Sequence, residues 1–144
     1  MPSAYDIIKS TIQAGSVYYY YEKALKSPKQ HNFIVININP SRDTVILLVC
    51  SSTGVDNTRR LRKDCPSETL VEITPNQYLG FSKRSIIDCN YVFEKSIDEI
   101  GDMHFRKKLQ TKPVMGLRLV KKLRQGVMLS NQISNQIKAL LQTD

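Results

Sequence analysis

The chain has 144 residues and a mass of 16.5 kDa, enough for one domain and too little for two of ordinary size. Hydrophobic residues make up 41% and charged residues 24%, which favours a folded chain with a real core over a disordered one. The formal net charge is +8 at pH 7, which favours polyanionic partners such as nucleic acid or an acidic protein.

The first predicted element is a helix over residues 3–14. Ser3 is suited to cap it, its apolar residues fall on one helical face, and Gly15 follows it. A run dense in aromatic strand formers comes next, at 17–21. We therefore expect a short helix that leads directly into the first strand.

Residues 31–38 and 44–50 are both strand-like, and the segment between them, 39–43, is a turn by composition. Two such strands around a short turn predict an antiparallel hairpin. The second strand is apolar from 45 to 50, so we expect it to be buried on both faces.

The middle of the chain alternates loops and strands. Residues 51–64 are polar and rich in Arg, which predicts a long exposed loop. Further strands are predicted at 69–73 and 85–93. Ser96 and Glu99 fit a capping box, so a helix should begin there and end near Gly101.

Beyond Gly101 the pattern changes from strands to helices. Apolar residues recur at helical spacing from Val114 to Leu123, and Gly126 interrupts the pattern. A last helix is predicted from Ser130 onward.

The predicted fold is α+β and mainly β. We expect a single domain over 1–144, with a small antiparallel barrel or sheet over about 16–94. The predicted helices, 3–14 and about 96–142, would pack at its ends.

The basic excess is confined to the last third of the sequence. Residues 1–102 hold twelve basic and twelve acidic side chains, whereas residues 103–144 hold nine basic side chains and one acidic. The wet face of an amphipathic helix and a polyanion-binding surface both explain this distribution.

Cys50, Cys65 and Cys89 are odd in number, widely spaced, and without a Cys-x-x-Cys pair. With no signal peptide, they predict a reducing, cytoplasmic location. The longest apolar run, 45–50, is far shorter than the roughly 20 residues that span a bilayer. We expect no membrane partner.

Several enzyme classes lack their motifs in this sequence. Neither phosphate-binding glycine loop occurs, and there is no His-Glu-x-x-His, EF-hand loop or Gly-x-Ser-x-Gly. The only histidines are His31 and His104, which excludes a site of several histidines within one chain. We expect no metal and no cofactor.

One end of the predicted hairpin gathers polar residues. His31 begins the first strand, and Ser51, Ser52 and Thr53 follow the second, so the antiparallel connection places them at the same end. An imidazole beside hydroxyls and arginines suits a phosphodiester, with His for proton transfer and Arg for phosphate charge. A solvent-facing histidine beside ordinary turn residues is the alternative interpretation. The predicted phosphate-binding side chains are Lys29, Arg59, Arg60, Arg62, Lys83 and Arg84.

The order of elements resembles the PemK/MazF-type toxins. Gly15–Tyr18 is similar to the opening Gly-x-Val/Ile-x strand of that family, and 31–36 with 46–53 stand in the place of its central hairpin. Residues 85–92 resemble its Ser-x-Val/Ile-x-Cys-Asp-x-Ile strand. The resemblance implies an SH3-like barrel, a homodimer, and a toxin whose partner is an acidic antitoxin.

The resemblance also implies metal-independent cleavage of single-stranded RNA. In that family an Arg at the start of the first hairpin strand and a Thr or Ser after the next are held to cleave RNA. By position, the Arg falls on His31 and the hydroxyl falls on Ser51, Ser52 or Thr53. A toxin-like endoribonuclease is therefore the leading hypothesis. The alternatives are a non-catalytic module that binds nucleic acid or an antitoxin, and a toxin that poisons a protein such as gyrase.

Overall fold

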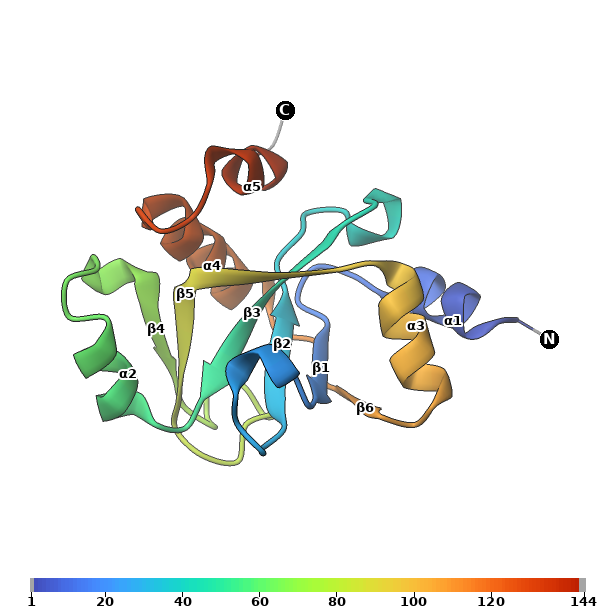
Figure 1. The fold of residues 1–144 in the computed structure, drawn as a ribbon, viewed down its shortest axis with the longest axis horizontal. Helices are drawn as coiled ribbons and strands as arrows, with labels where there is room; N and C mark the ends of the chain where they lie inside the picture. Colours follow the sequence, from blue (N-terminus) through green and yellow to red (C-terminus); the bar gives the residue numbers. More distant parts are fainter. Residues whose placement is uncertain (1, 143–144) are drawn as a thin grey trace.

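A computed structural model describes residues 2–142 and shows an α+β fold (Figure 1). In these residues an antiparallel sheet of six strands is accompanied by five α-helices. The strands are β1 (Val17–Tyr20), β2 (His31–Val35), β3 (Ile46–Ser52), β4 (Leu70–Ile73), β5 (Ser85–Lys95) and β6 (Leu109–Lys112). The α-helices are α1 (Ala4–Thr11), α2 (Val55–Leu61), α3 (Ile97–Phe105), α4 (Leu117–Leu129) and α5 (Asn135–Leu140). Short 3₁₀ turns are η1 (Lys23–Leu25), η2 (Pro40–Arg42) and η3 (Ser67–Thr69).

The strands lie in the order β4-β5-β3-β2-β1-β6. The predicted hairpin is confirmed, because β2 and β3 pair antiparallel with Phe33 opposite Cys50 and Val35 opposite Leu48. The predicted strand at 85–93 is also confirmed and extends to Lys95. This strand pairs with β3 on one side and with β4 on the other, so it joins the hairpin to the β4 edge of the sheet.

The sheet is open, so the prediction of a closed barrel is not met. Its edge strands, β4 and β6, have four residues each, and no pairing between them occurs within residues 2–142. The physical reason lies in how the two faces are buried. Helices cover both of them, so the sheet does not need to close on itself to exclude water.

Alternate residues of the central strands enter two separate cores, as the pleat of a strand dictates. In β3, Leu47 and Val49 belong to a core beneath α4 and α5, whereas Ile46 and Leu48 belong to a core beneath α1 and α3. Figure 1 shows α1 beside α3 and, away from them, α4 with α5. The prediction that this strand is buried on both faces is confirmed.

Two glycines that were expected to end helices lie inside them instead. A Cβ on Gly126 would lie 2.9 Å from Cys89 Sγ, so α4 needs glycine there to lie against β5. A Cβ on Gly101 would lie 3.1 Å from the backbone nitrogen of Tyr5, where α3 crosses α1. These glycines allow close packing between elements and do not stop the helices.

Other predicted bounds also change. The first helix ends at Thr11, and the last begins at Asn135, where Ser134 caps it. The segment 51–64 is not a long loop, because it contains α2. The capping box of Ser96 and Glu99 is confirmed. No helix of residues 2–142 has the length and apolar character needed to cross a membrane.

Candidate functional site

The β2–β3 hairpin brings the predicted site residues together at one end of the sheet. Continuing its register by two residues from the pair of Phe33 and Cys50 sets Ser52 opposite His31. On the other sides of these strands, His31 pairs with Tyr20 and Ser52 pairs with Ile86. Backbone pairing thus holds His31 from the β1 side and Ser52 from the β5 side.

Two cavities meet at this end of the sheet. The first, of about 720 Å³, lies beside α2 and is lined by residues of β2, β3, β5 and η1; we call it the α2 cavity. The second, of about 700 Å³, is lined by residues of β1, β2, β3, β6 and the loop before β5; we call it the lysine cleft. His31, Ser51 and Ser52 line both, so they form the border between them.

The lysine cleft joins cations from three separate segments. Lys29 precedes β2, Lys83 lies in the loop before β5, and Lys112 ends β6. Thr53 also lines the cleft, whereas no Asp or Glu of the described chain does. Lys112 Nζ lies 5.0 Å from the centre of the Tyr19 ring, a cation–π contact that positions it.

Lys112 is not among the predicted site residues, because β6 itself was not predicted. The strand Leu109–Lys112 is largely polar and follows a helix, so its sequence carries no alternating apolar pattern. It forms at the sheet edge by pairing with β1, where Val17 lies opposite Lys112. Only this long-range pairing carries Lys112 to the cleft.

Two polar atoms at the cleft are buried and unpartnered. His31 Nδ1 and Asn32 Oδ1 make no hydrogen bond within the part of the chain that the structure describes. Buried polar atoms are usually satisfied, so a donor or acceptor without a partner marks a position where a ligand or water is expected. Both residues line the lysine cleft.

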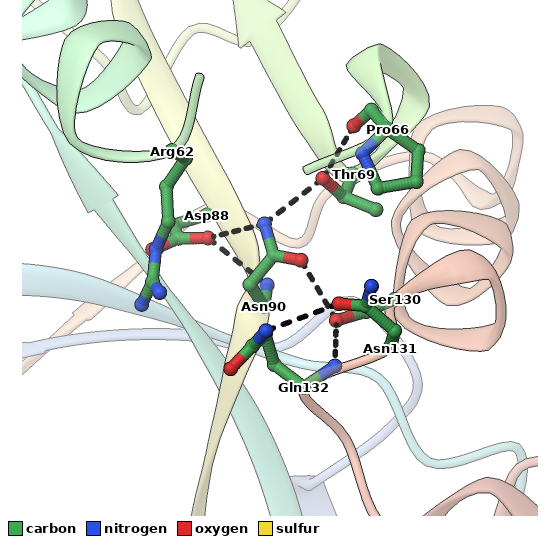
Figure 2. A network of polar contacts seen from close by, with 8 residues as sticks. All are labelled: Arg62, Pro66, Thr69, Asp88, Asn90, Ser130, Asn131 and Gln132. Atoms are coloured by element: carbon green, nitrogen blue, oxygen red, sulfur yellow. Dashed lines mark hydrogen bonds and ion pairs between the residues drawn. The ribbon is translucent and has the colours of Figure 1, made fainter. Parts of the chain in front are cut away.

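The α2 cavity contains an ion pair in place of free lysines. Arg62 Nε donates to Asp88 Oδ2 at 2.9 Å, and both residues line the cavity with their side chains partly exposed. Asp88 Oδ1 accepts from the backbone and side-chain nitrogens of Asn90, each at 3.0 Å (Figure 2). The carboxylate is thus held from two directions.

Asn90 extends this contact into a network that joins three elements (Figure 2). Its amide donates to Thr69 Oγ1 at 2.9 Å, and its carbonyl accepts from Ser130 Oγ at 2.7 Å. Thr69, Asn90 and Ser130 are all buried. The network therefore ties η3, β5 and the end of α4 together behind Asp88.

The predicted RNA-binding arginines are largely engaged in other contacts. Arg59 and Arg84 both bond to Glu72, at 3.0 and 2.9 Å, and Arg60 donates to Asn57 Oδ1 at 2.7 Å. Arg59 lies in α2 and bonds to Glu72 of β4. Arg62 directly follows α2 and bonds to Asp88 of β5, so neither rims an open loop. Of the predicted cations, Lys29 and Lys83 line the cleft.

Cys50 lines the α2 cavity beside Asp88 but is unsuited to be a nucleophile. Burial, and secondarily the Asp88 charge, raises the pKa of its thiol to about 12. The thiolate is the reactive form, so Cys50 is inert at neutral pH. Burial likewise raises the pKa of the Tyr20 hydroxyl, which belongs to the residue opposite His31.

His31, Ser51, Ser52 and Thr53, the predicted catalytic residues, thus all line the lysine cleft. Among residues 2–142, no three His, Cys, Asp or Glu side chains gather closely enough to hold a metal ion. Comparison of the sequence with protein-family models and with curated proteins finds no match.

Proposed function

We propose that the protein is a toxin-like endoribonuclease of the PemK/MazF type that cleaves single-stranded RNA in the cytoplasm without a metal. The observation that carries the proposal is the lysine cleft. Three lysines, a histidine and several hydroxyl side chains line it together, and no carboxylate of the described residues does. A phosphodiester backbone is the ligand that this combination of charge and hydrogen-bond donors suits best.

The chemistry follows from the groups present. His31 accepts the proton of the ribose 2′-hydroxyl, whose oxygen attacks the adjacent phosphorus. The bond from phosphorus to the 5′-oxygen breaks, which leaves a 2′,3′-cyclic phosphate. The 5′-oxygen takes a proton from water, and the hydroxide that remains takes back the proton held by His31. Lys29, Lys83 and Lys112 stabilise the charge on the non-bridging oxygens, and Ser52 or Thr53 orients the phosphate.

The resemblance to the PemK/MazF family is part of the proposal. The segments that carry it are β1, the β2–β3 hairpin and β5, which are neighbours in the sheet. The fold departs from the family pattern, because the sheet is open, with helices on both faces, and does not form a barrel. A homodimer and an acidic antitoxin partner are proposed on the same basis.

The basic C-terminal third supplies a surface for that antitoxin. Arg118, Lys121 and Lys122 are exposed on α4. Arg124 differs from them, because it turns inward and donates to the carbonyls of Ile36 and Asn37 at 2.6 and 3.1 Å. Its role is structural, so it does not belong to the docking surface.

The test is incubation of the purified protein with single-stranded RNA in EDTA. We expect cleavage by the native chain and a loss of roughly a hundredfold or more in rate for His31→Ala, the usual weight of a general acid/base. His104→Ala is the matched control, because it removes the other histidine, which lines neither cavity. RNA that stays intact with the native protein contradicts the proposal.

A non-catalytic module that binds RNA or an antitoxin is the second candidate. The observation that favours it is His31 itself, because histidine at the position of the family Arg lacks a permanent positive charge at neutral pH. This candidate predicts salt-dependent RNA binding without turnover. Growth arrest on expression without RNA breakdown would indicate the third, a toxin that poisons a protein.

A further inference from the structure

The α2 cavity has the size and lining of a site for a flat, partly polar ligand. Its volume of about 720 Å³ lies within the roughly 300–1,000 Å³ of small-molecule sites. Tyr91 and Phe93 form an aromatic pair in its wall, with ring centres 4.6 Å apart. Leu61, from α2, also lines it and is 74% exposed. Phe93 is buried, whereas Tyr91 is 51% exposed, so Tyr91 and Leu61 are the large apolar side chains open to a ligand.

The polar groups of the cavity have unused hydrogen-bonding capacity. Arg62 donates to Asp88 through Nε, and its two Nη groups have no partner among residues 2–142. Asp88 Oδ1 accepts two hydrogen bonds from Asn90, whereas Oδ2 accepts only that of Arg62. A carboxylate oxygen accepts two, so one acceptor site remains next to the free donors.

The network in Figure 2 holds this donor and acceptor in place. Asp88 is anchored through Asn90 to Thr69 and Ser130, all three of them buried. A polar pair that is already oriented loses little entropy when a ligand binds. The pair therefore presents a fixed pattern, a donor beside an acceptor.

The α2 cavity is also continuous with the lysine cleft. His31, Ser51 and Ser52 line both, so a phosphate held at this border has one nucleotide neighbour on each side. The cleft offers cations to the backbone, and the α2 cavity offers aromatic rings and a hydrogen-bonding pair. Aromatic side chains stack on bases, and side-chain pairs read base edges.

We propose that the α2 cavity binds the nucleobase next to the reacting phosphate and prefers guanine. This inference rests on the proposed function for the position of that phosphate. The Arg62 Nη groups donate to O6 and N7 of guanine, and Asp88 Oδ2 accepts from its N1–H. Adenine has an amino donor at position 6 and an acceptor at N1, the reverse of guanine. Its amino group would therefore face the Arg62 donors. Uracil has the same pattern as guanine but lacks N7 and the larger ring.

The experiment titrates the protein with GMP, AMP, CMP and UMP and follows backbone amide shifts by NMR. All four share the phosphate, so differences among them report the base. We expect GMP to bind roughly fivefold or more tightly than AMP, with the largest shifts in α2 and β5. Equal affinities for GMP and AMP, tighter binding of UMP than GMP, or shifts confined to the lysine cleft would each overturn the inference.

Two variants separate recognition from folding. Asp88→Asn keeps the shape and the bond to Asn90 but changes the acceptor, and it should abolish the preference for GMP over AMP. Tyr91→Leu leaves the network untouched and should weaken all four nucleotides severalfold by loss of stacking. Arg60→Ala is the control, because it lies on the same helix without lining the cavity. A preference for GMP that survives Asp88→Asn, or nucleotide affinities that Tyr91→Leu leaves unchanged, contradicts the inference.

Nucleotide binding and RNA cleavage are measured independently, so the base site and the endoribonuclease can fail separately. A preference for GMP in a protein that leaves RNA intact would sustain the base site and contradict the endoribonuclease. RNA cleavage without any base preference would sustain the endoribonuclease and contradict the base site. Mapping the cut positions in the native chain adds a third readout, since a base site next to the reacting phosphate predicts cuts beside guanosine.

Discussion

The lysine cleft and the α2 cavity share the ends of β2 and β3 but differ in how they treat charge. The cleft holds lysines that no carboxylate of the described chain accompanies there, whereas the cavity holds an arginine already paired with Asp88. An unpaired cation attracts any phosphate, and a paired one presents directional donors with little net charge. The difference teaches that one pair of strand ends can border both a site of unpaired positive charge and a site of oriented hydrogen-bonding groups.

Removal of the cleft lysines should have the largest effect on RNA binding. In Lys29→Ala/Lys83→Ala/Lys112→Ala we expect single-stranded RNA to bind roughly 10- to 100-fold more weakly, because three phosphate contacts are lost. The slope of log affinity against log salt should fall in magnitude by about 2, at about 0.7 for each phosphate. Fluorescence anisotropy of labelled RNA between low and high salt measures both quantities.

If the two cavities differ in this way, a variant of the α2 cavity should affect RNA binding differently in the same assay. Tyr91→Leu should weaken binding but leave the salt slope unchanged, because it removes stacking and no charge. If Tyr91→Leu flattens the slope as much as the lysine triple variant does, the two regions do not divide the work as described.

The network behind Asp88 should be the next most sensitive feature. Asn90→Ala leaves Thr69, Asp88 and Ser130 without their shared partner, so we expect the free energy of unfolding to fall by about 2–3 kcal/mol. Urea denaturation followed by circular dichroism measures it. Asn76→Ala, at an exposed turn position, is the control and should change stability by less than about 0.5 kcal/mol.

Alkaline pH should destabilise the fold through the buried thiols. Burial raises the pKa of Cys50 and Cys89 to about 12, from an ordinary value of 9.0. Between these values the unfolded chain loses thiol protons that the folded chain keeps, so stability falls as pH rises. Below about pH 8 no change is expected. Above about pH 9 each thiol contributes a slope approaching about 1.4 kcal/mol per pH unit.

Urea unfolding between about pH 7 and 10 tests this prediction. In Cys50→Ser one titrating thiol is removed, so the decline between about pH 9 and 10 should be less steep than in the native chain, and Cys89 with the buried Tyr18, Tyr20 and Tyr78, whose pKa values burial also raises, accounts for the rest. The same slope in both proteins would show that Cys50 titrates alike in the folded and unfolded states.

The smallest effect is expected at Arg59, one of the three predicted RNA-binding arginines that line neither cavity. Arg59 pairs with Glu72 at 3.0 Å, but its side chain is 44% exposed, so the pair contributes at most about 1 kcal/mol. Arg59→Ala should leave RNA affinity within a factor of about two. A loss of RNA binding comparable to that of the lysine triple variant would show that Arg59 contacts RNA after all.

The parts of the fold that sequence could predict are those with local signals. The apolar runs on either side of the turn at 39–43 predicted the β2–β3 hairpin, and the Ser96–Glu99 pattern predicted the start of α3. The hairpin alone was enough to bring His31 and Ser52 to one end of the sheet. The helix α2 escaped prediction because its seven residues contain one buried side chain, Val55.

The remaining features depend on contacts between distant segments. Strand β6 exists because it pairs with β1, so Lys112 had no local signal that would place it beside Lys29 and Lys83. The pairing of Arg62 with Asp88 joins residues 26 positions apart. The resemblance that favoured a barrel rests on strand sequences, which do not specify whether a sheet closes.

The glycine at position 126 has a consequence for mutational screens. It lines neither cavity, yet any side chain there collides with Cys89 and lifts α4 from β5. If the chain is the toxin proposed above, a library selected for loss of toxicity will return Gly126 variants alongside those of His31. The Gly126 variants will show reduced cellular abundance, and the His31 variants will show normal abundance. The protein level therefore distinguishes variants that fail to fold from variants that fold but lack activity.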